Sequence, residues 1–160
     1  MKAADEPLKH IGLYSNTITH KNEDPSTSGC EIDIYSSGDR YFGTFSWADW
    51  QLEMPTGILY DVVIDKASNS ISLSAKLSTG STYSAESGKF RQAHDLFEFH
   101  GHFGKGVLSG FVTQKDGYTY PPTLQMKKFI KLNKLREKTA VPYKSYDEWA
   151  SWSIHAPANW

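Results

Sequence analysis

The chain has 160 residues, of which 39% are hydrophobic and 22% charged, a composition typical of a globular protein built on one core. The formal net charge of -1 gives no reason to expect a nucleic-acid or anionic-membrane partner. Aromatic residues make up 14%, which in a β protein indicates bulky inward layers or a binding surface. No stretch is apolar enough to predict a transmembrane segment.

The N-terminal residues 1–7 are polar and look like the start of a mature exported chain whose leader was replaced by Met. We therefore expect a periplasmic or secreted protein, with a cytoplasmic location as the alternative. The chain has a single cysteine, Cys30, so no internal disulfide can form. Cys30 alternates with Ile32 and Ile34, which predicts a small buried side chain in place of a reactive thiol.

The first half of the chain alternates between apolar and polar residues, as half-buried strands do. Strands are expected over residues 11–18, 30–35, 41–47, 58–65 and 70–77. The fourth of these places Ile58, Tyr60, Val62 and Ile64 on one parity. The fifth alternates most regularly, with Ile71 and Leu73 inward. The following residues, 78–89, are rich in Ser, Thr and Gly, which predicts a mobile loop.

The stretch 94–113 predicts a hairpin, because glycines at 104 and 106 can supply the turn. Its first strand has an aromatic face (Phe97, Phe99 and Phe103) and a polar face (Glu98, His100 and His102). A last strand is expected over 124–132, with its inward residues interrupted by Lys128. Near the C-terminus, Ser145 and Glu148 fit a capping box, which predicts a short helix carrying Tyr146, Trp149 and possibly Trp152.

About eight short strands joined by turns predict an all-β protein, an antiparallel up-and-down eight-stranded barrel with a short C-terminal helix. We expect one domain over residues 1–160, with the barrel over about 11–132 and the tail over 133–160. The core is expected to include seven aliphatic residues: Ile32, Ile34, Val62, Ile64, Ile71, Leu73 and Leu108.

The chain resembles lipocalin-like (calycin) β-barrels, in particular the small bacterial ones. The resemblance lies in the Gly-containing strand segments 12–14, 41–45, 99–101 and 108–110, and in residues 62–65 with 71–73. It implies a lipocalin-like barrel and a role in binding a ligand or a partner. It assigns no functional residue.

Glu98, His100 and His102 are the candidate metal ligands, because residues two apart on a strand point the same way. Zinc and non-haem iron accept such nitrogen and oxygen donors. The alternative is a polar strip on the outside of the barrel. That alternative holds if Phe97 and Phe99 point into the core.

Enzymatic function has little support in the sequence. Asp33, Asp61 and Asp65 alternate with apolar residues, as outer-face residues do, and no Gly-x-Ser-x-Gly segment is present. We therefore expect a non-catalytic protein that needs no cofactor. The candidate binding residues are aromatic, since large rigid side chains in loops favour recognition: Trp47, Trp50, Tyr60, Tyr118 and Tyr120.

Two functions remain open at this point. The barrel could bind a small apolar or amphipathic ligand, or its loops and tail could bind a protein partner, as an inhibitor or immunity-type protein would. A metal-dependent enzyme that uses the His100/His102 pair is a distant third.

Overall fold

A computed structural model describes residues 7–21, 24–136, 143–152 and 155–160, and the backbone alone of Thr82 and Arg136. The N-terminal segment that suggested export therefore lies almost wholly outside the described residues, as does part of the tail, 137–142. No helix among the described residues is long and apolar enough to cross a membrane.

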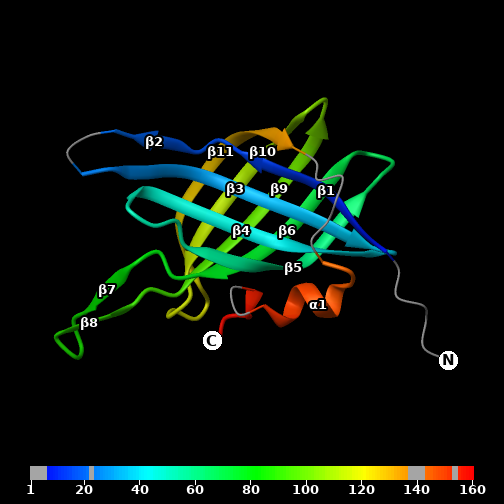
Figure 1. The fold of residues 1–160 in the computed structure, drawn as a ribbon. Coiled ribbons are helices and arrows are strands. Elements are labelled where there is room, and N and C mark those ends of the chain that lie inside the picture. Colours follow the sequence, from blue (N-terminus) through cyan, green and yellow to red (C-terminus); the bar gives the residue numbers. More distant parts are fainter. Residues whose placement is uncertain (1–6, 22–23, 137–142, 153–154) are drawn as a thin grey trace.

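Eight antiparallel strands form a closed barrel, as the sequence predicts (Figure 1). The strands are β1 (Leu8–Ser15), β3 (Ser26–Ser37), β4 (Arg40–Gln51), β5 (Thr56–Asp65), β6 (Ser70–Leu77), β9 (Asp95–Gly104), β10 (Val107–Asp116) and β11 (Thr123–Arg136). Closure occurs at β1, which pairs with β3 on one side and with β11 on the other. Closing the sheet satisfies the backbone groups that an open sheet leaves at its edges.

Three short strands lie outside this closed ring. β2 (Ile18–His20) continues beyond β1 and pairs with β3. β7 (Ser81–Ser84) and β8 (Lys89–Gln92) form a separate hairpin that projects from the barrel between β6 and β9 (Figure 1). The segment 78–89, predicted as a mobile loop, therefore contains strand β7 and the first residue of β8. Tyr83 and Phe90 face each other across the hairpin, with ring centroids 5.4 Å apart, and such aromatic pairs stabilise antiparallel strands.

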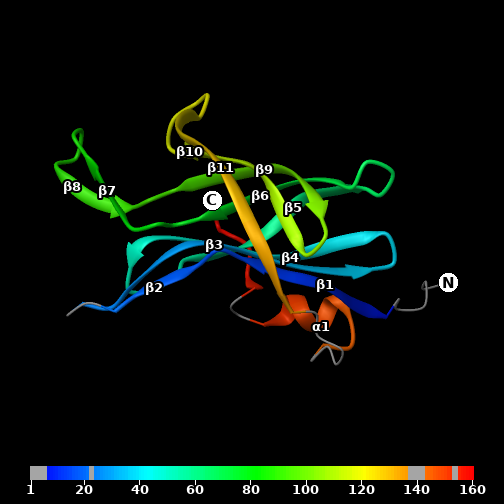
Figure 2. The same ribbon diagram turned by 90° about the horizontal axis from the view of Figure 1, so that it is seen from above.

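The two ends of the barrel differ. At one end, short turns join β3 to β4, β5 to β6 and β9 to β10. The opposite end carries the longer connections between β2 and β3, β4 and β5, and β10 and β11, together with the β7–β8 hairpin (Figures 1 and 2). We call this second end the mouth. Loops near a common end are the usual place for binding residues on a rigid barrel.

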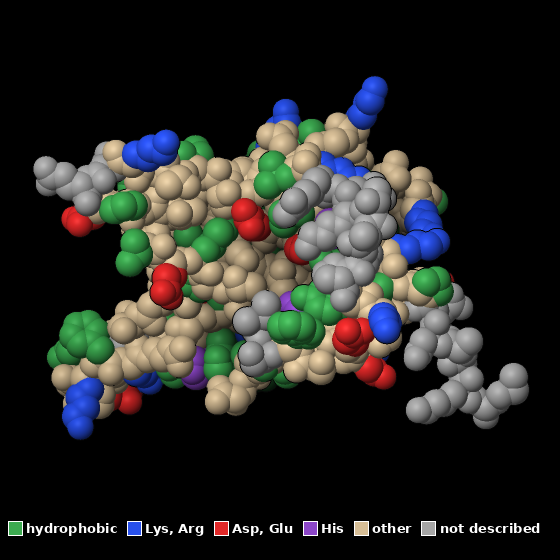
Figure 3. Space-filling model, in the orientation of Figure 1, with side chains coloured by type: hydrophobic (Ala, Val, Ile, Leu, Met, Phe, Trp, Pro, Cys, Tyr) green, Lys and Arg blue, Asp and Glu red, His purple; other side chains and the backbone are tan. Residues whose placement is uncertain are grey.

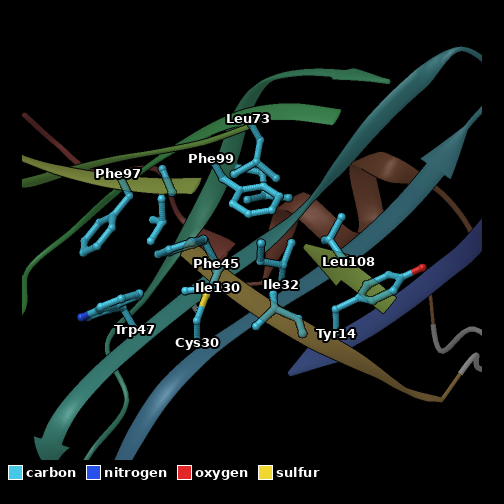
Figure 4. Close-up of a cluster of buried hydrophobic side chains, with 14 of the residues drawn as sticks. Tyr14, Cys30, Ile32, Phe45, Trp47, Leu73, Phe97, Phe99, Leu108 and Ile130 are labelled. Carbon is cyan, nitrogen blue, oxygen red and sulfur yellow. The ribbon is translucent and has the colours of Figure 1, made fainter. Parts of the chain in front are cut away.

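The barrel interior is packed with side chains (Figure 4). Phe45, Phe97 and Phe99 are fully buried there, which confirms the aromatic face expected for the 94–113 hairpin. The ring of Phe99 lies over Gly101, where a Cβ atom would come within 2.5 Å of the ring. Space left by this glycine is therefore filled by a neighbouring aromatic ring. Five of the seven expected core residues are buried, while Val62 and Ile64 are half-buried against the same cluster.

Strand β5 corrects one detail of the predicted core. Its pairing with β6 shifts between Tyr60 and Val63, and Asp61 in between has a left-handed φ of 51°. A bulge adds one residue and so reverses which parity faces inward. Leu59 consequently lies in the core before the bulge, and Val62 follows it inward after the bulge. Tyr60, predicted to share one parity with Val62, therefore lies on the opposite face from it.

The C-terminal helix, α1 (Tyr146–Ser151), packs on the outer wall of the barrel (Figure 2). Ser145 caps it as predicted, its Oγ accepting a hydrogen bond of 3.2 Å from the Glu148 backbone N–H. Trp149 is the buried residue of the helix, and it packs in a second hydrophobic cluster with Tyr35, Phe42 and other residues. Ile58 belongs to this outer cluster, so the prediction that Ile58 shares a face with Val62 and Ile64 is also wrong.

Candidate functional site: a pocket at the barrel mouth

The mouth contains a pocket of about 320 Å³, which exists because β1 stops before the barrel does. β1 meets β11 only through Leu13, Tyr14 and Ser15, opposite the last residues of β11. Beyond Ser15 the chain passes into β2, which pairs with β3. The first part of β11 is thus left as the far wall of an opening. The pocket is lined by Asn16, Ile18, Ser28, Gly29, Cys30, Trp47, Ala48, Asp49, Trp50, Met126, Lys128 and Ile130.

The passage from β1 to β2 is fixed by Asn16 and Gly29. The Asn16 side-chain Oδ1 accepts a hydrogen bond of 2.7 Å from the Cys30 backbone N–H, and so replaces a strand carbonyl. Gly29 has a φ of 121°, and a Cβ atom there would lie 2.8 Å from both Asn16 Oδ1 and Thr17 Cα. Glycine is needed because it accepts this φ and leaves room for the crossing chain.

The floor of the pocket is apolar. Trp47 packs on Phe97, with ring centroids 5.4 Å apart, and thereby closes the packed interior below the mouth. Cys30 and Ile130 are buried beside it. Burial, and secondarily the charge of Glu31, raises the pKa of the Cys30 thiol, so this sulfur remains protonated. This buried environment is consistent with the prediction that Cys30 is a small buried side chain and not a reactive thiol.

Trp50 forms the rim. Its φ of 55° is left-handed, which is uncommon for a large side chain, and 60% of its surface is exposed. The indole ring stacks on His20, with centroids 3.5 Å apart, and His20 Nε2 shares a hydrogen bond of 2.8 Å with Ser28 Oγ. Stacking on His20 therefore holds the exposed indole ring of Trp50 beside the pocket.

Lys128 is the residue of this site that sequence reasoning missed. It has the inward parity of Met126 and Ile130 in β11, and all three line the pocket. Among the described residues, Lys128 has no carboxylate within 4.0 Å. The available signal was the lysine that interrupts an otherwise apolar parity. Lys128 is exposed at the edge of the pocket, and Asp49 adds a carboxylate to the same lining. A cation at the edge of an apolar floor is able to pair with an anionic group of a bound molecule.

Trp47 and Trp50 are thus brought together at one pocket, whereas the other predicted binding residues lie elsewhere. Tyr60 is on the outer wall, and its ring lies 5.9 Å from Lys76 Nζ. Tyr120 is 99% exposed in the β10–β11 connection.

Tyr118 is held in a column of rings on the outside of the barrel. It stacks on His94 at 4.0 Å, and His94 stacks on Trp160 at 4.2 Å. The Arg91 guanidinium covers the other side of Tyr118, 3.5 Å from its ring centroid. Tyr118 therefore has a packing role in this structure.

Glu98, His100 and His102 point away from the core. His100 and His102 are exposed, and Glu98 is half-exposed with its carboxylate 3.5 Å from Lys115 Nζ. No group of three His, Cys, Asp or Glu side chains within the described ranges is arranged to hold a metal ion. The geometry therefore supports the alternative in which Glu98, His100 and His102 form a polar strip on the outside of the barrel.

Comparison of the chain with protein-family models, with curated proteins and with solved structures found no match. The class defined by fold and site is that of a closed eight-stranded antiparallel β-barrel with a pocket at its mouth. This architecture is compatible with a lipocalin-like fold.

Proposed function

We propose that the protein is a non-catalytic, lipocalin-like binding protein that takes a small amphipathic ligand in the mouth pocket. The observation that carries this proposal is the inward-facing Lys128 above an apolar floor made by Trp47, Cys30 and Ile130. Such a pocket favours a molecule with an apolar body and an anionic end. The proposed location is the periplasm or the extracellular space, with the cytoplasm as the alternative.

The size of the pocket limits the ligand. The interior below Trp47 is occupied by Phe45, Phe97 and Phe99, so an apolar chain has room at the mouth and little below it. A volume of about 320 Å³ lies at the lower end of the range for small-molecule sites. A short acyl chain or a single ring system fits these limits better than a long lipid.

A non-catalytic role agrees with the chemistry of the lining. Cys30, the strongest potential nucleophile there, is fully buried and has a raised pKa. Ser28 Oγ shares its hydrogen bond with His20, but His20 is stacked beneath Trp50 at the rim. Cys30 lacks exposure to a substrate, and among the described residues no side chain bonds to the other ring nitrogen of His20 to orient it as a base for Ser28.

Calorimetric titration with octanoate, octanol and octylammonium tests the proposal, because the three probes share a chain and differ in head-group charge. We expect octanoate to bind most tightly, and Lys128→Met to weaken octanoate by about tenfold while leaving octanol unchanged. Lys131→Met is the matched control, since Lys131 lies on the outward parity of the same strand. Equal affinities for all three probes, or equal losses in both variants, would contradict the assignment of Lys128.

A protein partner is the second candidate, favoured by exposed apolar side chains around the mouth. They lie on β2, on the β4–β5 region, on the β7–β8 hairpin, in the β10–β11 connection and at the start of β11: Ile18, Trp50, Leu52, Tyr83, Phe90, Tyr120 and Leu124. Figure 3 shows hydrophobic side chains on the projecting hairpin and on the opposite side of the mouth. Clustered exposed apolar residues often mark protein-binding surfaces. In this case Phe90→Ser should weaken partner binding without changing octanoate affinity.

A further inference from the structure

A second pocket, of about 420 Å³, lies on the outer wall of the barrel under the C-terminal segment. We call it the outer pocket. It shares no residue with the mouth pocket and is lined by Asp33, Tyr35, Thr44, Ser46, Thr56, Tyr143, Trp149 and His155. The first five are contributed by β3, β4 and β5, and the last three by the tail.

One end of the outer pocket carries the Asp33 carboxylate. Its Oδ1 accepts a hydrogen bond of 2.6 Å from Nε2 of His10, which is buried in the wall beside it. The Tyr35 hydroxyl also bonds to Asp33, and burial, followed by the charge of Asp33, raises the pKa of this phenol. Tyr35 therefore donates its proton to the carboxylate. A carboxylate has about four acceptor positions, so these two bonds leave others unused, and 22% of the Asp33 side chain remains exposed.

Ser46 also presents an acceptor. The Thr56 hydroxyl donates to the Met54 carbonyl at 3.2 Å, so its hydrogen is not available to Ser46. The 2.8 Å bond between the two hydroxyls is then donated by Ser46 to Thr56 Oγ1. With its own hydrogen used, Ser46 Oγ is left with lone pairs.

His155 presents a third acceptor to the pocket. Its Nδ1 lies 2.6 Å from the Trp149 carbonyl oxygen, and a carbonyl can only accept, so Nδ1 carries the hydrogen. In the neutral imidazole, Nε2 is then the acceptor. The ring is stacked on Trp149 at 4.3 Å, which fixes its orientation against the apolar wall of the pocket.

The hydrogens of His10, Tyr35, Ser46, Thr56 and His155 Nδ1 are already used, so these groups present acceptors to the outer pocket. The hydroxyls of Thr44 and Tyr143 in the same lining are able to donate or to accept. None of the described residues that line it is Lys or Arg, and Asp33 brings a negative charge. The remaining walls are the rings of Tyr35, Tyr143 and Trp149. A ligand that complements this lining brings several N–H donors, a positive charge and a compact apolar body.

We propose that the outer pocket binds a small organic ammonium ion, with its N–H groups directed at Asp33, Ser46 and His155 and its apolar part against the aromatic wall. The proposal is independent of the mouth pocket and of any ligand bound there. An anion is disfavoured because it would meet the Asp33 carboxylate without a compensating cation in the lining.

Benzylammonium, benzyl alcohol and benzoate are suitable probes, since they share one ring and differ in charge. Each is titrated into ¹⁵N-labelled protein, and the amide shifts of β3 and β4 are followed by NMR. We expect benzylammonium to shift the amides around Thr44 and Ser46, and to bind at least about tenfold more tightly than benzyl alcohol. Tighter binding of the alcohol would instead assign a neutral polyol-type site and overturn the proposal.

Asp33→Asn removes the charge while keeping an oxygen that can accept from His10. We expect it to reduce benzylammonium affinity by at least about tenfold and to leave benzyl alcohol nearly unchanged. Glu98→Gln is the matched control, because it removes an outer-wall carboxylate far from this lining. If Asp33→Asn does not fold, His155→Gln provides the second variant, with a smaller expected loss. Unchanged affinity in the folded variant, or shifts confined to the mouth, would overturn the assignment.

Discussion

Trp149→Ala is expected to release the C-terminal helix from a barrel that otherwise stays folded. Trp149 is only 2% exposed and contacts Phe42 on the outer wall and Tyr146 within the helix. A buried Trp removes about 150–250 Å² from water, which corresponds to about 4–6 kcal/mol at about 25 cal/mol per Å². Substitutions of buried Trp by Ala cost about 3–5 kcal/mol. We therefore expect a loss of about 3–5 kcal/mol in the free energy of docking.

The loss should be local because α1 has only six residues. Helices shorter than about 12 residues are marginal in water, so α1 depends on its contacts with the wall. The barrel has its own core, in which Trp149 takes no part. The free energy of opening can therefore be much lower for the helix than for the barrel, so that the helix detaches while the barrel stays folded.

Hydrogen exchange of the α1 amides, read beside urea denaturation of the whole protein, measures the two effects separately. The amides of α1 should exchange far faster in Trp149→Ala, while β9 and β10 amides keep their protection. Trp152→Ala is the control, because Trp152 is 56% exposed at the end of the same helix. Unchanged α1 exchange in Trp149→Ala, or equal acceleration by Trp152→Ala, would refute the reasoning.

Three further results are expected. Leu73→Ala should lower the free energy of unfolding by about 2–5 kcal/mol in urea, and Ile64→Ala by less, since Ile64 is only half-buried. The reverse order would contradict the half-buried position of Ile64. The free energy of unfolding should fall above about pH 10, by up to about 1.4 kcal/mol per pH unit from Tyr35, because the raised pKa keeps the folded phenol protonated while the unfolded one ionises. Tyr35→Phe should reduce this slope. An identical slope in the variant would contradict the role of Tyr35. Cys30 should resist iodoacetamide at pH 8 until the barrel unfolds, and rapid alkylation of the native protein would show that the floor of the mouth pocket is open.

Periodicity predicted the barrel because burial on one face imposes a two-residue pattern on each strand. Ile32, Ile34, Ile71 and Leu73 follow that pattern and are buried. The same rule failed at Ile58 and Tyr60, because the bulge at Asp61 changes the parity within one strand. Nothing in alternation alone reveals a bulge when apolar residues stand on both sides of it.

The sites were harder to predict, because they depend on which distant segments meet. Trp47 and Trp50 are predicted as aromatic candidates, but their partner Lys128 follows them by about half of the chain. Asp33 was interpreted as an outer-face residue, and it does lie on the outer face. Its burial beneath the tail depends on tertiary packing with Trp149 and His155, which strand periodicity does not encode.

Both pockets lie where regular strand pairing gives way to another interaction. At the mouth, Gly29 and Trp50 have left-handed backbone angles on neighbouring strands, and the Asn16 side chain substitutes for a missing strand partner. An uncommon backbone conformation of a large residue persists only where its surroundings hold it, and such positions concentrate at functional sites. Here the angle at Trp50 places the indole on His20 beside an inward lysine. On the outer wall, strand pairing gives way to a contact between the strands and the C-terminal tail. There the acceptors of Asp33 and Ser46 are covered by tail residues that supply few donors. The packed interior stabilises the barrel, and both proposed binding sites lie outside it.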